Sequence, residues 1–327
     1  MRLGESAGRT HPGKVRRRNE DSYVLDPPLF AVADGMGGAQ AGEVASRLTA
    51  AAFREYHEAD ALPPDERIQS IIQEANRRVY ERSSEDSDAS GMGTTVTVAL
   101  VEDGSVTIGH VGDSRAYLIR GDSLEQLTDD HSLVAELVRS GRLSPEEDES
   151  HPQRSVITRA LGTDPDVDVD TLSVAAEPGD LFLICSDGLT SMVGDDTILD
   201  IVERNRGNLD QAAKELVARA NRSGGEDNIT VVFFEIAEEG AAVLEETRPM
   251  PALDESGPAE TDEDTLSGLE RVPAVDTMVV APEKAATEEA QAPTSEPKRS
   301  RWRVLALLLI VLLLLAGAAV LYWVLYL

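Results

Sequence analysis

Cysteine is almost absent from this sequence: of 327 residues, only Cys185 carries a thiol. An intramolecular disulfide framework is therefore excluded, and a reducing compartment is the natural setting. Cys185 lies inside an apolar run, which favours a small buried hydrophobic side chain over a catalytic thiol.

Positive charge is also scarce. The sequence has 30 Lys and Arg against 60 Asp and Glu, which gives a net charge of −30. A nucleic-acid backbone would be repelled, so we expect no nucleic-acid partner, and the acidic balance favours cation binding. There is no internal repeat and no nucleotide-binding glycine loop. Since 41% of the residues are apolar, most of the chain can bury a core.

Charge is missing altogether from residues 304–327, a run of 24 residues. A helix of this length can cross a hydrocarbon core of about 30 Å, so we predict a single transmembrane helix. A buried core helix is disfavoured because the run is apolar on every side. The preceding segment 298–303 is basic, and residues 1–10 lack a signal-peptide pattern. We expect a single-pass protein of the cell membrane, anchored in lipid, with its N-terminal part in the cytoplasm.

Residues 237–297 are rich in Pro, Ala, Glu and Thr, with 16 acidic and three basic side chains. Such a composition cannot bury enough apolar surface to order itself, so we predict a disordered acidic linker. At this length it would span roughly 40 to 45 Å and act as a tether.

The remaining residues, 1–236, are expected to form one globular domain. Alternating apolar residues separated by turn residues predict an antiparallel meander, with strands at 94–101, 105–111 and 115–119. Helical periodicity predicts helices at 41–57, 65–82, 132–140 and 209–222. Long helices beside antiparallel strands indicate an α+β class with segregated layers.

Three apolar runs are bordered by aspartates. One run ends in Asp34-Gly35, a second ends in Asp187-Gly188, and a third begins just after Asp227-Asn228. An ionised Asp beside a core strand must be paired or bound to a metal, because its removal from water is costly. Buried strands that bring carboxylates to one point predict a site for hard divalent cations. A tight strand-to-helix turn at residues 34–38 is the alternative for the first of them.

Further charged residues belong to the same pattern. Arg16, Glu20 and Asp21 lie just upstream of the first run, and Asp113 interrupts the predicted meander. For the neighbouring Arg17 and Arg18, a solvated basic turn is favoured over a part in the site.

The motifs occur in a fixed order: Arg-x-x-Asn-Glu-Asp at 16–21, Asp-Gly-Met-Gly-Gly at 34–38, Gly-Met-Gly-Thr-Thr at 91–95, Gly-Asp-Ser-Arg at 112–115, Ile-Thr-Arg-Ala-Leu-Gly at 157–162, Ser-Asp-Gly at 186–188 and Glu-Asp-Asn at 226–228. This series closely resembles the metal-dependent protein phosphatases of the 2C type, in particular the bacterial serine/threonine phosphatases. The resemblance covers roughly residues 4–236. It implies a four-layer α-β-β-α sandwich of two antiparallel sheets flanked by helices.

The resemblance also implies roles for individual residues. It assigns Asp34 to bridge two Mn²⁺ or Mg²⁺ ions, with the Gly35 carbonyl on one of them. It assigns Asp187 and Asp227 to the other ion, and Glu20 and Asp21 to metal-bound water. It also assigns Asp113, together with Asp187, to a third ion, and Arg16 to the phosphate. A hydroxide shared by two cations would then attack phosphorus, so no nucleophilic Ser or Cys is needed.

One position departs from many eukaryotic members of that family. Met36 follows Asp34-Gly35 where those members have a histidine proposed to protonate the leaving oxygen. Methionine cannot donate a proton, and no histidine of this chain can be assigned the role from sequence; His131, at the start of a predicted helix, is the favoured candidate.

We therefore expect a protein serine/threonine phosphatase acting on phosphorylated proteins, among them a membrane Ser/Thr kinase and its substrates. A catalytically silent family member, acting as a membrane-anchored interaction module, is the alternative, although Asp34, Asp113, Asp187 and Asp227 are all present. Structural Ca²⁺ binding is a third reading, but no Asp-x-Asp-x-Asp-Gly loop with a Glu at its twelfth position occurs.

Overall fold

The computed structural model describes residues 2–37, 41–55, 62–85, 91–144, 151, 153 and 156–238, all within one unit, Met1–Arg248. Most of the predicted linker 237–297, the basic segment 298–303 and the predicted transmembrane helix 304–327 lie outside the described residues. Within these described ranges, no helix combines the length and the apolar character needed to cross a bilayer.

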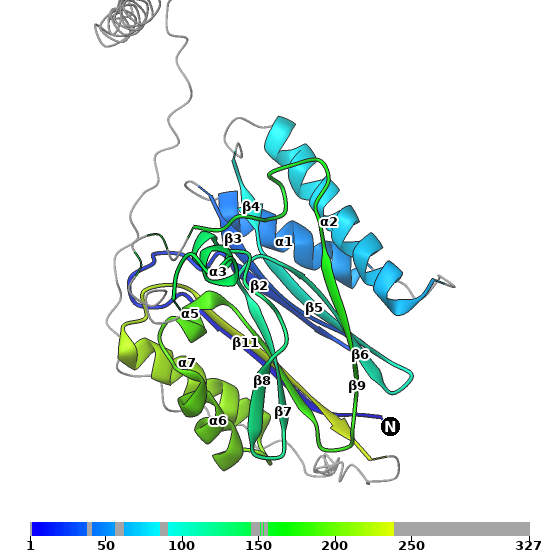
Figure 1. Cartoon of the computed structure of the whole chain (residues 1–327), viewed down its shortest axis with the longest axis vertical. Helices are drawn as coiled ribbons and strands as arrows, with labels where there is room; N and C mark the ends of the chain where they lie inside the picture. The colour runs from blue at the N-terminus through cyan, green and yellow to red at the C-terminus, as the bar shows by residue number, and fades with distance from the viewer. Residues whose placement is uncertain are drawn as a thin grey trace, which may run out of the picture. The chain divides into compact units, whose positions relative to one another are not determined.

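Two antiparallel sheets form the centre of the domain (Figure 1). One has the strand order β1 (Arg2–His11), β11 (Ile229–Ala237), β10 (Leu181–Cys185), β7 (Arg115–Arg120) and β8 (Ser123–Gln126). The other has the order β2 (Asp21–Asp26), β3 (Leu29–Met36), β5 (Val96–Glu102), β6 (Ser105–Val111) and β9 (Asp170–Ala175), with the short β4 (Gly93–Thr94) beside β3.

Helices cover the outer face of each sheet (Figure 1). The long helices α1 (Ala41–Arg54) and α2 (Pro64–Glu85) pack on the β2-to-β9 sheet. The other sheet carries α5 (Asp187–Thr190), α6 (Asp195–Arg204) and α7 (Leu209–Ser223), and α3 (Leu133–Arg139) follows β8. The predicted α+β class, with two antiparallel sheets flanked by helices, is confirmed for this part of the chain.

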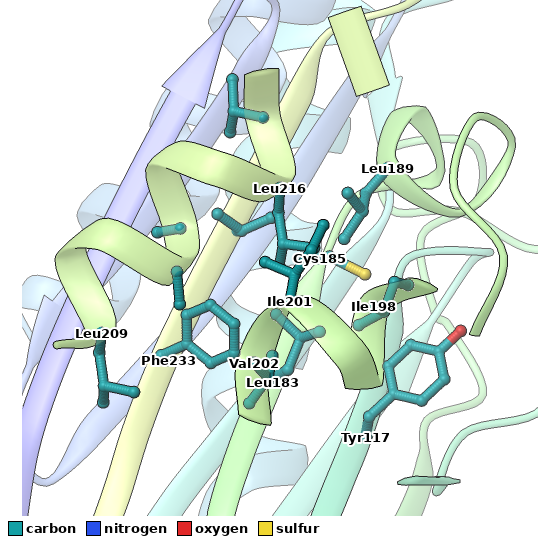
Figure 2. Close-up of a cluster of buried hydrophobic side chains, with 14 of the residues drawn as sticks. Tyr117, Leu183, Cys185, Leu189, Ile198, Ile201, Val202, Leu209, Leu216 and Phe233 are labelled. Carbon is teal, nitrogen blue, oxygen red and sulfur yellow. The ribbon is translucent and has the colours of Figure 1, made fainter. Parts of the chain in front are cut away.

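The apolar run of β10 shows how the layers hold together. Leu183 and Cys185 point toward α6 and α7, where they pack with Ile201 and Leu216 (Figure 2). Phe182 and Ile184, which alternate with them along the strand, face the opposite way, into the core between the two sheets. Both faces of the strand are buried, which explains why its sequence is apolar without alternation.

Stacked aromatic rings join the two sheets in this central core. The ring of Phe234 lies 4.3 Å from that of Phe30 and 5.0 Å from that of Phe182, centroid to centroid. Each such pair adds about 0.5–1.5 kcal/mol beyond its buried area. The core therefore fixes the spacing of the sheets whose ends carry the predicted site.

Cys185 behaves as predicted. Its side chain is completely buried, and burial raises the pKa of its thiol to about 12. The thiol stays protonated at neutral pH, which rules it out as a nucleophile.

The predicted continuous meander is wrong at one point. β5 and β6 do form a hairpin, but β6 pairs next with β9, whereas β7 pairs with β10 and β8 in the other sheet. The chain crosses between the sheets at Gly112-Asp113-Ser114. Alternation of apolar residues specifies which face of a strand is buried, but it does not specify the sheet to which the strand belongs. The crossing places Asp113 between the two sheets at the end of the sandwich.

Candidate active site

The predicted carboxylates meet at one end of the sandwich because strand ends converge there. Asp34 lies near the end of β3 and stands directly opposite Asp21, the first residue of β2. Asp113 follows β6, Asp187 follows β10, and Asp227 precedes β11 by two residues. In antiparallel sheets the end of one strand adjoins the start of its neighbour, so residues distant in sequence become neighbours.

Asp21 is buried and connects the two sheets. Its Oδ2 atom accepts hydrogen bonds from the Thr230 hydroxyl at 2.5 Å and the Ser186 hydroxyl at 2.9 Å. Its Oδ1 atom is buried with no hydrogen-bond partner in the described structure. Burial, opposed by these two hydroxyls and reinforced by the charges of Asp187 and Asp227, raises the pKa of Asp21 to about 7.

Asp34 is held by its backbone. Its carbonyl accepts from the Thr95 backbone N–H and from the Thr94 hydroxyl, both at 2.8 Å, and its own N–H donates to Thr95 Oγ1 at 3.2 Å. These three bonds fix the backbone at Asp34 without involving its side-chain carboxylate. Burial and the nearby charges of Asp21 and Asp187 raise the pKa of Asp34 well above its ordinary value.

Asp113 and Asp187 complete the crowded group. Burial is the main cause of the raised pKa of both carboxyl groups. It raises the pKa of Asp187 to about 6, and repulsion from Asp227 adds to the shift. For Asp113, burial and the charge of Asp187 raise the pKa to about 8. In each residue, Oδ1 is buried and lacks a hydrogen-bond partner within the described part of the chain. A buried carboxylate oxygen without a donor is costly unless a cation is bound.

Arg16 and Asp227 are bonded to each other. The Arg16 Nη2 atom donates to Asp227 Oδ2 at 2.7 Å, and half of the Arg16 side chain is exposed. Glu20 also faces Arg16, and burial raises its pKa above the ordinary value. The structure therefore brings the predicted phosphate-binding guanidinium to the edge of the carboxylate group.

Asn228 fixes the segment that carries Arg16. Its side-chain amide donates to the carbonyls of Pro12 at 3.0 Å and Arg18 at 2.8 Å, and its Oδ1 accepts from the Glu20 backbone N–H at 2.7 Å. The sequence predicted a role in the site for Asp227 but none for its neighbour Asn228. The signal that could have revealed Asn228 is the Glu-Asp-Asn motif at 226–228, which contains both residues.

Two glycines let backbones approach one another at the site. A Cβ on Gly188 would lie 2.0 Å from the Asn228 carbonyl oxygen, and a Cβ on Gly35 would lie 2.1 Å from the Gly42 carbonyl oxygen. Only glycine fits at either position. The motif residue Gly38 lies outside the described residues.

Asp130 is a carboxylate that sequence reasoning missed. It accepts two hydrogen bonds from the Arg115 guanidinium, at 2.9 and 2.8 Å, and its charge acts on both Asp113 and Asp187. The only signal was a pair of aspartates before a Ser-capped helix, which is a common surface pattern. Asp130 adds negative charge at the Asp113 side of the site.

His131 is not placed to protonate a leaving group. Its Nδ1 accepts from the Gly112 backbone N–H at 3.0 Å, and its Nε2 lies 3.0 Å from Asp170 Oδ2, so both ring nitrogens are used. The ring is buried, and burial lowers its pKa. His131 therefore supports the Gly112-Asp113 crossing.

The donor set fits a hard divalent cation. All the candidate ligands are oxygens, three buried carboxylate oxygens lack partners, and the raised pKa values show that uncompensated negative charge is unfavourable there. As placed, the described residues contain no group of three His, Cys, Asp or Glu side chains that could hold one ion. Mn²⁺ and Mg²⁺ accept water and carbonyl oxygens besides a few carboxylates, so the residues fit such ions.

Comparison with known proteins agrees with this chemistry. A family model described as protein phosphatase 2C matches residues 17–224. The serine/threonine phosphatase stp of Listeria welshimeri is 41% identical over 237 residues, covering 69% of this chain and 94% of that protein. The crystal structure of the Mycobacterium tuberculosis serine/threonine phosphatase PstP/Ppp has a TM-score of 0.68 at 38% identity and covers 72% of this chain and 100% of that one.

A second solved structure is the catalytic domain of PstP in complex with two manganese ions. It has a TM-score of 0.67 at 36% identity and covers 72% of this chain and 99% of that one. Both the family match and these relatives extend over the domain that carries the carboxylates. The chain therefore belongs to the protein phosphatase 2C family and is a metal-dependent serine/threonine protein phosphatase.

Proposed function

We propose that this phosphatase uses two Mn²⁺ or Mg²⁺ ions, which Asp34, Asp187 and Asp227 would hold, with Asp34 contributing to both. The observation that carries the proposal is the convergence of carboxylates with partnerless buried oxygens beside an exposed arginine. The two manganese ions of the PstP structure support the same number here. We propose further that the Gly35 carbonyl completes one ligand shell and that Glu20 and Asp21 hold water in place.

Bound divalent cations acidify water and neutralise phosphate charge, which is the chemistry that phosphoryl transfer requires. The side chains of the protein bind the phosphate and orient the carboxylates. Arg16 donates a hydrogen bond from Nη2 to Asp227. The other N–H groups of its planar guanidinium can bind the oxygens of a phosphate. Thr94 and Thr95 hold the backbone of Asp34, so the carboxylate keeps one direction.

We also propose that Asp113 and Asp187 would together hold a third ion. The two charges act on each other, and the Oδ1 atoms of both are buried without a partner in the described structure. Two hydrogen bonds between His131 and Gly112, one donated by each residue's backbone N–H, hold Asp113 at this edge.

Turnover of an aryl phosphate tests the enzymatic proposal. We expect the full-length chain with Mn²⁺ to hydrolyse p-nitrophenyl phosphate and phosphothreonine peptides, and a chelator to abolish both activities. Asp187→Ala should lose activity by more than about a hundredfold, since one removed transition-state interaction costs about 3 kcal/mol or more. The matched control Asp200→Asn, an exposed aspartate on α6, should keep activity. No turnover by the wild-type chain, or turnover unaffected by Asp187→Ala, would contradict the proposal.

We also propose that residues 304–327 anchor the enzyme in the cell membrane, with the catalytic domain in the cytoplasm. The uncharged 24-residue run after the basic segment 298–303 supports this. Tethering raises the effective concentration of partners on the same membrane, so phosphorylated membrane proteins, among them a Ser/Thr kinase, are the proposed substrates.

Cell fractionation tests the anchor. The full-length chain should sediment with membranes and resist extraction by high salt, and deletion of residues 304–327 should release it to the soluble fraction. Recovery of the full-length chain in the soluble fraction would refute the anchor and leave the enzymatic proposal intact.

A further inference from the structure

A basic groove lies between β1 and α7, apart from the carboxylate group. It is lined by Arg9, Thr10, His11, Lys14, Lys214, Val217, Ala218, Asn221 and Arg222. These residues include four cationic side chains and one imidazole, and no carboxylate. We call this surface the β1–α7 groove.

The concentration of cations in the groove contrasts with the rest of the sequence. The net charge is −30, and the first 283 residues contain only two lysines, Lys14 and Lys214, both of which line the groove. Arg9 is bonded to Asp210 at 2.7 and 2.8 Å. Lys14, Lys214 and Arg222 are exposed, and within the described ranges none of the three has an ion-pair partner. A set of unpaired cations on an acidic protein attracts anions.

Two apolar residues, Val217 and Ala218, also line the groove. They lie between Lys214 and Arg222 in the sequence of α7, and Val217 is buried against the core of its sheet. Apolar residues together with cations suit an extended peptide that carries carboxylates, because peptide binding needs apolar contact as well as charge.

The groove and the catalytic site share two segments of the chain. The Lys14 backbone N–H donates to the Gly225 carbonyl at 2.7 Å, and the Asn221 amide lies 3.3 Å from the His11 ring. Two residues beyond Lys14, Arg16 reaches Asp227. The segments 11–16 and 221–227 therefore form the groove at one end and position the proposed phosphate-binding arginine at the other.

We propose that the β1–α7 groove binds acidic residues that flank the phosphorylated Ser or Thr of a protein substrate. The proposal rests on the proposed function, because Arg16 must hold the phosphate for a flanking segment to reach the groove. It assigns the enzyme a substrate class, namely phosphoproteins with Asp or Glu near the phosphosite. Rim charges of this kind alter substrate preference and are weakened by salt.

The test compares three substrates on the full-length chain with Mn²⁺: a phosphothreonine peptide with flanking Glu residues, the same peptide with Gln in their place, and p-nitrophenyl phosphate. We expect a higher kcat/KM for the Glu peptide. In the double variant Lys214→Ala/Arg222→Ala, this preference should fall by about five- to tenfold through KM, the size expected for two exposed ion pairs. The aryl phosphate and the Gln peptide should be unaffected.

Arg219→Ala is the matched control, because Arg219 is an exposed cation on the same helix that does not line the groove. It should keep the preference, and the charge reversal Lys214→Glu should deepen the loss. Equal loss on all three substrates, or no preference in the wild-type chain, would overturn the proposal. Loss of binding to phosphatidylglycerol vesicles with an unchanged peptide preference would also overturn it, in favour of a membrane contact. No hydrolysis of the aryl phosphate by the wild-type chain would instead contradict the proposed function.

Discussion

Thr230 donates its hydroxyl to Asp21 at 2.5 Å, from β11 in one sheet to β2 in the other. The bond joins the two sheets at the end where the carboxylates gather. Asp21 also stands opposite Asp34 in the β2–β3 ladder, where two like charges repel. The hydroxyls of Thr230 and Ser186 are thus the donors that allow Asp21 to remain there.

Thr230→Val should destabilise the protein by about 1.5–3 kcal/mol, because it removes a hydrogen bond to an ionisable buried group. Urea unfolding at pH 8 in a chelator measures this change. Thr49→Val is the matched control, since the Thr49 hydroxyl is buried without a hydrogen-bond partner in the described structure and its loss should cost nothing. Equal effects of the two variants would show that the Thr230 hydroxyl contributes no specific stabilisation.

In a chelator, the free energy of unfolding should fall as pH rises from about 6.5 to 8. The folded-state pKa values of Asp21 and Asp113 are raised from 3.8 to about 7 and about 8, so the folded state binds more protons than the unfolded state in this range. Each such proton changes stability by about 1.4 kcal/mol per pH unit. Unfolding followed at several pH values gives the slope.

A buried imidazole has the opposite effect at lower pH, where it makes the free energy of unfolding rise with pH. Burial lowers the pKa of His110 to about 4, so its contribution to stability is lost as pH falls below 6.5. Between about pH 4 and 6.5 His110 therefore opposes the carboxylates, and above pH 6.5 their effect is no longer opposed by His110. A stability that stays flat or rises between pH 6.5 and 8 would contradict the crowding of carboxylates.

Gly188→Ala should reduce both stability and activity. The added Cβ would lie 2.0 Å from the Asn228 carbonyl oxygen, so the Asp187 and Asp227 segments must separate, at a cost of about 1–3 kcal/mol. Gly207→Ala serves as its control, because nothing lies within 4 Å of that Cβ position. Thermal unfolding and aryl phosphate turnover measure the two effects. An active and fully stable Gly188→Ala variant would show that the close approach is unnecessary.

Arg16→Ala should lower kcat/KM for an aryl phosphate by about ten- to a hundredfold, the range expected for a lost charged hydrogen bond to phosphate. Arg16→Lys should recover only part of the loss, since lysine lacks the planar fork. Arg17→Ala, the change of an exposed neighbour, should leave turnover at the wild-type level. An equal loss in the Arg16 and Arg17 variants would mean that general positive charge, rather than a specific contact, is what matters.

The sequence predicted the parts of the site that follow from strand ends. Asp34 and Asp187 close uninterrupted apolar runs, and a buried run can place its last carboxylate only at a sheet edge. The long helices α2 and α7 were predictable from periodicity, and Asn208 caps α7 by accepting a hydrogen bond from the Gln211 backbone N–H.

Contacts between residues far apart in the sequence were harder to predict. The pattern around Gly112 resembles a hairpin turn, and only the pairing of β7 with β10 shows that the chain changes sheets. Asp130 and Asn228 act through partners more than ten residues away, which no local pattern specifies. The roles of individual carboxylates stay predictions, because their positions alone do not determine which ion each would hold.

Manganese titration of the full-length chain tests the central claim most directly. Calorimetry should show at least two Mn²⁺ ions per wild-type chain, the number in the PstP structure, and wild-type stoichiometry in Asp200→Asn. Asp34→Asn keeps the side-chain size but removes the proposed bridging charge, so it should bind neither ion at the same concentrations. A wild-type chain that binds no manganese, or an Asp34→Asn variant that binds two ions with unchanged affinity, would contradict the account.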